Sequence, residues 1–255
     1  MRWSLKLGTI SGIRLYLHWS FLILLGLVFF YDLGGVGLTA AAQRLFFVLS
    51  LFACIVLHEL GHALAARKYG IPTRDITLLP IGGVARLERM PREPKQELWV
   101  AIAGPLVNVA IAITLFALLV AIRLSKSTFL ASQDSFITLL MRINLFLIAF
   151  NLLPAFPMDG GRVLRALLAQ RLEYVRATRI AARIGQVMAV FFVLAGLYSI
   201  IFASTHPNAH PSPMLALIGV FIFFGARNEA HIAEVGRNIE PTEPARPVPT
   251  YFLRG

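Results

Sequence analysis

Charged residues are scarce in this chain. They make up 15% of its 255 residues, against about 25% in soluble globular domains, and 57% of the residues are hydrophobic. This composition excludes an ordinary water-soluble domain and predicts an integral membrane protein. Acidic residues are scarcer still, since 13 Asp and Glu stand against 24 Lys and Arg. Because the basic residues lie between apolar runs, the expected partner is the lipid bilayer and not nucleic acid.

Cysteine is almost missing, and no signal peptide is recognisable. The single cysteine, Cys54, excludes an internal disulfide framework. The first apolar run has no small-residue cleavage site after it, so it is expected to stay as a transmembrane helix. Apolar stretches cover residues 15–31, 41–66, 98–122, 136–153, 185–203 and 214–225. They predict an all-α polytopic membrane protein with about six transmembrane helices.

The basic residues are distributed unequally between the connecting loops. Lys and Arg are frequent before the first stretch, after the second, after the fourth and after the sixth, and they are few in the other connections. Cytoplasmic loops retain Lys and Arg. We therefore predict a multi-pass protein of the cell membrane with both termini in the cytoplasm.

Residues 70–97 do not have the pattern of a membrane span. Residues 71–80 and 84–88 favour strands, and Gly82-Gly83 between them favours a turn. We expect a short β-hairpin or edge-strand element at the cytoplasmic rim, which could bind an extended peptide by strand addition. An ordinary connecting loop is the alternative.

The carboxyl-terminal part of the chain loses its apolar character after Gly225. Residues 241–249 contain four prolines, which is typical of a segment without regular structure. The predicted organisation is a transmembrane domain over residues 1–226 and a flexible cytoplasmic tail over residues 227–255.

One apolar stretch contains His58, Glu59 and His62. Histidines four residues apart lie on one face of a helix, where both can bind one zinc ion, and a neighbouring glutamate can act as a general base. Two core histidines and a buried glutamate would be the structural alternative. That alternative leaves three polar groups in need of partners within lipid, so the metal site is favoured.

A catalytic zinc site needs a third protein ligand, and the best candidate is Asp159. Pro154 and Pro157 must interrupt the fourth helix shortly before it. Gly160-Gly161 then lets the backbone turn into a new helix. The alternative is that Asp159 caps the amino end of that helix, and one aspartate could serve both purposes.

These motifs resemble those of the site-2 protease family of intramembrane zinc metalloproteases. The resemblance rests on residues 58–62, 104–108 and 151–160 and extends over residues 15–225. It implies that His58, His62 and Asp159 bind one Zn²⁺ per chain and that Glu59 is the general base of peptide hydrolysis. The pattern is most similar to the compact six-span prokaryotic branch, without a PDZ domain between spans or a pair of CBS repeats.

The same resemblance implies the class of partner. The expected substrate is a single-span membrane protein, cut within or near its transmembrane segment in regulated intramembrane proteolysis. A regulatory membrane partner is compatible with this function, and the oligomeric state stays open.

Two asparagines supply further polar side chains in the third and fourth spans. Asn151 is the candidate for catalytic support, as a donor to the oxyanion. Asn108 is the candidate for orienting a ligand or positioning substrate. Either residue could instead tie helices together.

A metal or proton transporter is the alternative function. It would use His58, His62 and Asp159 as a transient cation site, but it gives no reason for the position of Glu59 between the histidines.

Overall fold

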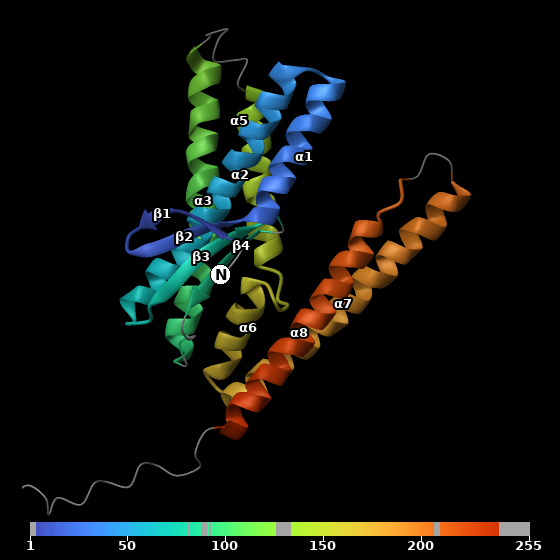
Figure 1. The fold of residues 1–255 in the computed structure, drawn as a ribbon. Coiled ribbons are helices and arrows are strands. Elements are labelled where there is room, and N and C mark those ends of the chain that lie inside the picture. The colour runs from blue at the N-terminus through green and yellow to red at the C-terminus, as the bar shows by residue number, and fades with distance from the viewer. Residues whose placement is uncertain are drawn as a thin grey trace, which may run out of the picture.

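The computed structural model describes residues 4–80, 82–87, 91, 93–125, 134–206 and 210–239. Its helices and strands, in chain order, are β1 (Ser4–Ile10), β2 (Ile13–His18), α1 (Trp19–Gly35), α2 (Leu38–Lys68), β3 (Thr73–Leu79), β4 (Gly82–Leu87), α3 (Pro94–Ser125), α5 (Asp134–Asn151), α6 (Asp159–Ala169), α7 (Tyr174–Thr205) and α8 (Pro213–Ile239). Figure 1 shows α1, α2, α3 and α5 gathered in one bundle, whereas α7 and α8 form a long hairpin that diverges from it. The short helix α6 lies between these two parts.

Each of the six predicted apolar stretches overlaps one helix. Among the described residues, four helices are long and apolar enough to cross a membrane: α2, α3 over Pro94–Leu124, α7, and α8 over Pro213–Val235. Helix α1 and the Phe136–Asn151 part of α5 are shorter apolar helices. The prediction of a multi-pass, mainly helical membrane protein is confirmed.

The predicted start of the first span was wrong. Residues 15–18 belong to strand β2, and helix α1 begins at Trp19. The boundary lies at His18, whose imidazole Nδ1 accepts a hydrogen bond from the backbone N–H of Ser20. A side-chain acceptor at the N-cap satisfies an amide that has no partner inside the helix.

The β element is larger than the predicted hairpin. Strands β3 and β4 do form an antiparallel hairpin, but they belong to a four-stranded mixed sheet in the order β1-β2-β3-β4. The β1–β2 hairpin was missed, and β2 runs parallel to β3. Its signal was present, since the buried residues Ile13, Leu15 and Leu17 alternate with more exposed neighbours. That alternation is the period of a half-buried strand, but it ran directly into an apolar helix.

The buried face of the sheet packs on helix α2. Ile13, Leu15 and Ile76 enclose Ala63 in one cluster, and Leu17 and Leu78 pack with aromatic residues of α1 and α2 in another. The sheet therefore covers the half of α2 that carries the 58–62 motif.

The chain between α5 and α6 is not helical. Helix α5 ends at Asn151 and α6 begins at Asp159, as Pro154 and Pro157 predict. The predicted role of Gly160 needs correction, because its backbone is not in the left-handed region. A Cβ at Gly160 would lie 2.2 Å from the carbonyl oxygen of Leu153, so what this position requires is close approach of the backbone.

Helices α7 and α8 dock on the segment that joins α5 to α6. Ala155 packs with Ala189 and Ile222, and Phe156 packs with Ala182 and Ala226. Helix α8 continues to Ile239, beyond the predicted end of the transmembrane domain at residue 226. Residues 240–255 of the predicted tail lie outside the described residues.

Candidate metal centre

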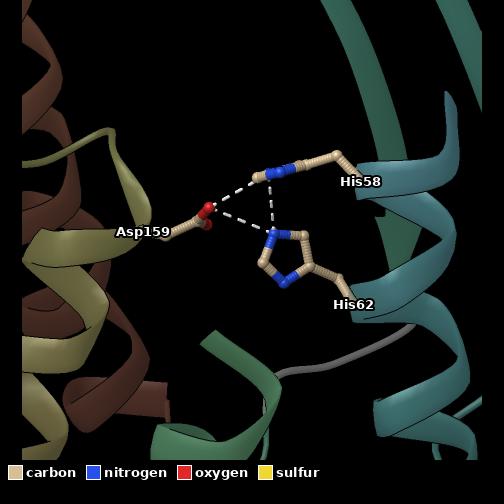
Figure 2. A group of neighbouring side chains, drawn as sticks. All are labelled: His58, His62 and Asp159. Atoms are coloured by element: carbon tan, nitrogen blue, oxygen red, sulfur yellow. Dashed lines mark hydrogen bonds and ion pairs between the residues drawn. The ribbon is translucent and has the colours of Figure 1, made fainter. Parts of the chain in front are cut away.

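His58 and His62 project from consecutive turns of α2 and are both buried, with 6% and 4% of their surface exposed. Their Nε2 atoms lie 3.2 Å apart. Figure 2 shows both imidazoles directed to the same point, where the carboxylate of Asp159 meets them from the opposite side. The four-residue spacing therefore places the two side chains as predicted.

Asp159 is the third member of this cluster. Its Oδ2 atom lies 3.2 Å from Nε2 of His58 and 3.1 Å from Nε2 of His62. Asp159 is 7% exposed and is the first residue of α6, while Met158 occupies the N-cap position. The N-cap alternative is therefore not what the structure contains.

The three side chains fit a zinc ion in both type and spacing. Zinc binds imidazole nitrogen and carboxylate oxygen at about 2.0–2.2 Å in tetrahedral geometry, which separates ligand atoms by roughly 3.3–3.5 Å. The three atoms observed here are 3.1 to 3.2 Å apart. Among the described residues this is the group of His, Cys, Asp and Glu side chains that could hold a metal ion.

Helix α3 supports His62 from behind. The Nδ1–H of His62 donates a hydrogen bond of 2.7 Å to the carbonyl oxygen of Val100, which orients the ring so that Nε2 faces the centre. Gly104 allows this close approach, because a Cβ there would lie 2.2 Å from Nε2 of His62. The resemblance at residues 104–108 thus corresponds to a glycine that makes room for a metal-site histidine.

A cavity of about 390 Å³ adjoins the three side chains. Glu59 lines it, and strand β4 passes over Glu59 so closely that a Cβ at Gly83 would lie 2.9 Å from Cγ of Glu59. Phe221 of α8 completes the wall on another side. Strand β4 and Glu59 therefore form adjoining parts of the same cavity wall.

Asn151 and Asn108 lie in different surroundings. Asn151 ends α5 and lines the cavity. Asn108 is fully buried in α3, is not among the cavity residues, and neither polar atom of its side chain has a hydrogen-bond partner in the described part of the chain. Cys54 is buried and lies 3.5 Å from the amide nitrogen of Asn144. The roles assigned to Asn151 and Asn108 stay predictions.

Two arginines of α6 were not singled out in the sequence, one in the cavity wall and one in the interior. Arg162 lines the cavity, with Nη1 4.0 Å from Oδ1 of Asp159; its i, i+3 spacing from Asp159 was the available signal. Arg165 is 2% exposed. In the sequence it is one more basic residue of a cytoplasmic loop, so nothing local marks it as buried.

Comparisons with known proteins agree with this geometry. Residues 46–129 and 120–192 match the profile of the family described as Peptidase family M50. The zinc metalloprotease MJ0392 of Methanocaldococcus jannaschii is 38% identical over 98% of this chain and 68% of its own length. The putative zinc metalloprotease Rip3 of Mycobacterium tuberculosis is 37% identical over 90% of this chain, which spans 59% of that relative.

A solved structure is also similar. The site-2 protease from Methanocaldococcus jannaschii superimposes with a TM-score of 0.57 at 36% identity, covering 89% of this chain and 95% of the solved chain. The family match and this superposition agree on the fold of the chain.

Proposed function

This chain is an intramembrane zinc metalloprotease of peptidase family M50, the site-2 protease family, and from that premise we propose that it hydrolyses a peptide bond within or near the transmembrane segment of single-span membrane proteins. The observation that carries the proposal is the convergence of His58, His62 and Asp159 beside a cavity that Glu59 also lines. A metal site open to a peptide-sized space on one side is the arrangement that hydrolysis needs.

In the proposed mechanism His58, His62 and Asp159 hold one Zn²⁺. When bound, zinc polarises the scissile carbonyl and makes the attacking water more acidic. Glu59 accepts the proton of that water and later returns it to the leaving amine. Its place in the cavity wall, next to His58 in the sequence, keeps its carboxylate within reach of both events.

Asn151 and Arg162 are the polar cavity residues placed to assist. We assign Asn151 as a donor to the oxyanion, because it lines the cavity at the end of α5 and a fixed donor there stabilises developing charge. Arg162 faces Oδ1 of Asp159 at 4.0 Å. It therefore favours the ionised carboxylate and leaves Oδ2 directed at the histidines.

Asn108 is assigned as an orienting partner of His58. Gly104 of α3 contacts His62 of α2, and the two helices run in opposite directions. One turn further along α3 is Asn108, and one turn back along α2 is His58, so the two residues lie at the same level. Both have polar atoms without a partner in the described part of the chain, Nδ1 in the case of His58.

Strand β4 is the proposed docking element for the substrate. It ends the sheet in the order β1-β2-β3-β4, and residues 82–85 of β4 line the cavity. A peptide bond inside a helix is already hydrogen-bonded, so the substrate has to unwind before attack. An unwound segment can pair with the outer edge of β4 by strand addition, which favours substrates with helix-breaking residues in their membrane segment.

Glu59→Gln separates this function from a metal or proton carrier. The variant is co-expressed with single-span proteins that carry glycine or proline in their transmembrane segment, and fragments are resolved by size. We expect cleavage to fall by about 10²- to 10⁴-fold while bound zinc is retained. Glu234→Gln, at an exposed ion pair with Arg179, is the matched control with normal cleavage.

The opposite results are equally clear. Cleavage by Glu59→Gln at the rate of the unmodified protein contradicts the proposed base. Cation flux through purified protein in vesicles, lost in a His58 variant and accompanied by no cleavage of any tested substrate, would favour the carrier.

We further propose that both termini lie in the cytoplasm, on the basis of the distribution of Lys and Arg. Since Cys54 is the sole cysteine and is buried, single introduced cysteines can be labelled selectively. A membrane-impermeant maleimide added to intact cells should label His210→Cys and spare Lys6→Cys, both of which are exposed positions. The reverse pattern would invert the proposed orientation.

A further inference from the structure

Three charged side chains meet in the interior at a distance from the ligands. Arg165 of α6 donates from Nε to Oε1 of Glu97 at 2.8 Å and from Nη1 to Oε1 of Glu229 at 2.7 Å. Arg165 is 2% exposed and Glu97 is fully buried, while the side chain of Glu229 is 30% exposed. We call these three residues the Arg165 cluster.

Two aromatic rings lie next to the guanidinium of Arg165. Its Cζ atom lies 5.0 Å from the ring centroid of Phe156 and 5.0 Å from that of Tyr174. Contacts of this kind stabilise a cation, and the planar fork of arginine allows two carboxylates to bind in fixed directions. The cluster is therefore a rigid joint between α3, α6, α7 and α8.

A buried ion pair is a poor source of stability, because removing its charges from water offsets much of their attraction. Because stability alone does not account for it, the cluster calls for another role. The Arg165 cluster contains no residue of the cavity wall, so contact with substrate does not explain it. Its role is inferred from the helices that it connects.

The cluster joins α6, which carries Asp159, to α3, which accepts the hydrogen bond from His62. Glu97 lies one turn before Val100, the residue that accepts the hydrogen bond from His62. Arg165 lies on the same short helix as Asp159, about 9 Å further along its axis. Phe156 belongs to the non-helical segment that leads into Asp159. Contacts that fix α6 against α3 therefore help to fix the position of Asp159 relative to His62.

We propose that Arg165, with Glu97, is a positioning residue of the metal centre, which holds α6 against α3 so that Asp159 stays within ligand distance of the two histidines. The need for it follows from the broken backbone, because no continuous helix connects α5 to α6 and tertiary contacts alone must place Asp159. Glu229 extends the same joint to α8 and has a smaller share, since it is partly exposed. This inference rests on the proposed role of Asp159 as a ligand.

The test removes the two buried charges together and leaves only Glu229, whose side chain is 30% exposed to solvent, without its partner. Replacing a complete buried ion pair by apolar residues of similar volume preserves folding, so the double variant Glu97→Leu with Arg165→Met is compared with the unmodified protein in detergent. Zinc affinity is measured by competition with a chelator, and the absorption spectrum of the cobalt(II)-substituted protein reports the ligand geometry. We expect zinc affinity to fall about 10- to 100-fold, with an altered cobalt spectrum.

Controls and smaller changes complete the series. Arg179→Met removes an exposed ion pair between α7 and α8 and should leave zinc affinity and the cobalt spectrum unchanged. Arg165→Lys keeps the charge but loses the fork, so it should lie between the double variant and the unmodified protein. Glu229→Gln should weaken zinc binding less than the double variant does.

Asp159→Asn, measured in parallel, distinguishes failure of the inference from failure of the proposed ligand set. If Asp159→Asn loses zinc while the double variant binds zinc like the unmodified protein, the positioning role is overturned and the proposed function stands. If Asp159→Asn binds zinc at full affinity, both are overturned. Should the double variant be recovered unfolded, Arg165→Lys decides: weaker zinc binding supports the role, and unchanged binding overturns it.

Discussion

The two sides of the metal centre are built by different means. His58 and His62 stand on one uninterrupted helix, where the four-residue spacing alone places them on one face. Asp159 follows a non-helical segment, and its position depends on contacts of α6 with α3 and α7. The histidine side is therefore locally determined, whereas the aspartate side is set by packing. Substitutions that disturb the packing of α6 should therefore weaken zinc binding without changing a ligand.

Loss of a ligand should have the same effect on zinc binding whether the ligand comes from the histidine side or from the aspartate side of the metal centre. His58→Asn and Asp159→Asn each take one of the three ligands from a site that needs three. Loss of an orienting partner lowers metal affinity about 10- to 100-fold. We expect zinc affinity to fall further than this in both variants, and cleavage to stop. Zinc content per purified chain checks this, and retention of zinc by either variant would show that its residue is not a ligand.

Proline in strand β4 should affect cleavage and spare zinc. Val84 and Ala85 are replaced by proline one at a time, because successive backbone N–H groups point to opposite sides of a strand and one of the two variants removes an outward donor. That variant should cleave about tenfold more slowly, the effect of losing roughly 1.4 kcal/mol of docking energy. Leu7→Pro, on the opposite edge strand β1, is the control, and equal rates in all three would contradict docking on β4.

An added methyl group should affect a different quantity on each side of the metal centre, stability on the aspartate side and zinc affinity on the histidine side. In Gly160→Ala the Cβ would meet backbone, the carbonyl oxygen of Leu153 at 2.2 Å, so we expect a loss of about 1–3 kcal/mol in the free energy of unfolding. In Gly104→Ala the Cβ would meet the movable imidazole of His62, and the main loss should be in zinc affinity. Gly26→Ala, with open space around it, is the control for both measurements.

The smallest effect is expected at Asn108. Asn108→Leu keeps the number of side-chain heavy atoms and removes polar atoms that have no partner in the described part of the chain, so the free energy of unfolding should change little. If Asn108 orients His58, zinc affinity nevertheless falls about tenfold. A stable variant with unchanged zinc affinity would assign Asn108 to packing alone.

The outcome of the sequence-based predictions follows the same division. The 58–62 motif, the six apolar helices and the break before Asp159 were readable, because each depends on spacing or on proline within a few residues. The family and the class of enzyme inferred from those motifs are confirmed by the comparisons. The β1–β2 hairpin was missed, since its alternating pattern merged with the apolar helix that follows.

The roles of the charged residues were the hardest to predict from the sequence. Arg162 and Arg165 were counted with the basic residues that indicate a cytoplasmic loop, yet one lines the cavity and the other is 2% exposed. Burial of an arginine depends on partners far away in the chain, here Glu97 and Glu229. No local pattern marks such a pair before the helices are packed.

The sequence by itself determined the membrane class, the existence of the six apolar helices and the pair of histidines with its glutamate. The reason is that hydropathy, proline and a four-residue spacing act over one or two helical turns. Only the tertiary structure decided that Asp159 reaches the histidines, that β4 covers Glu59 and that Arg165 joins α6 to α3 and α8. Those contacts join residues between 24 and 101 positions apart in the chain, and packing alone brings them together.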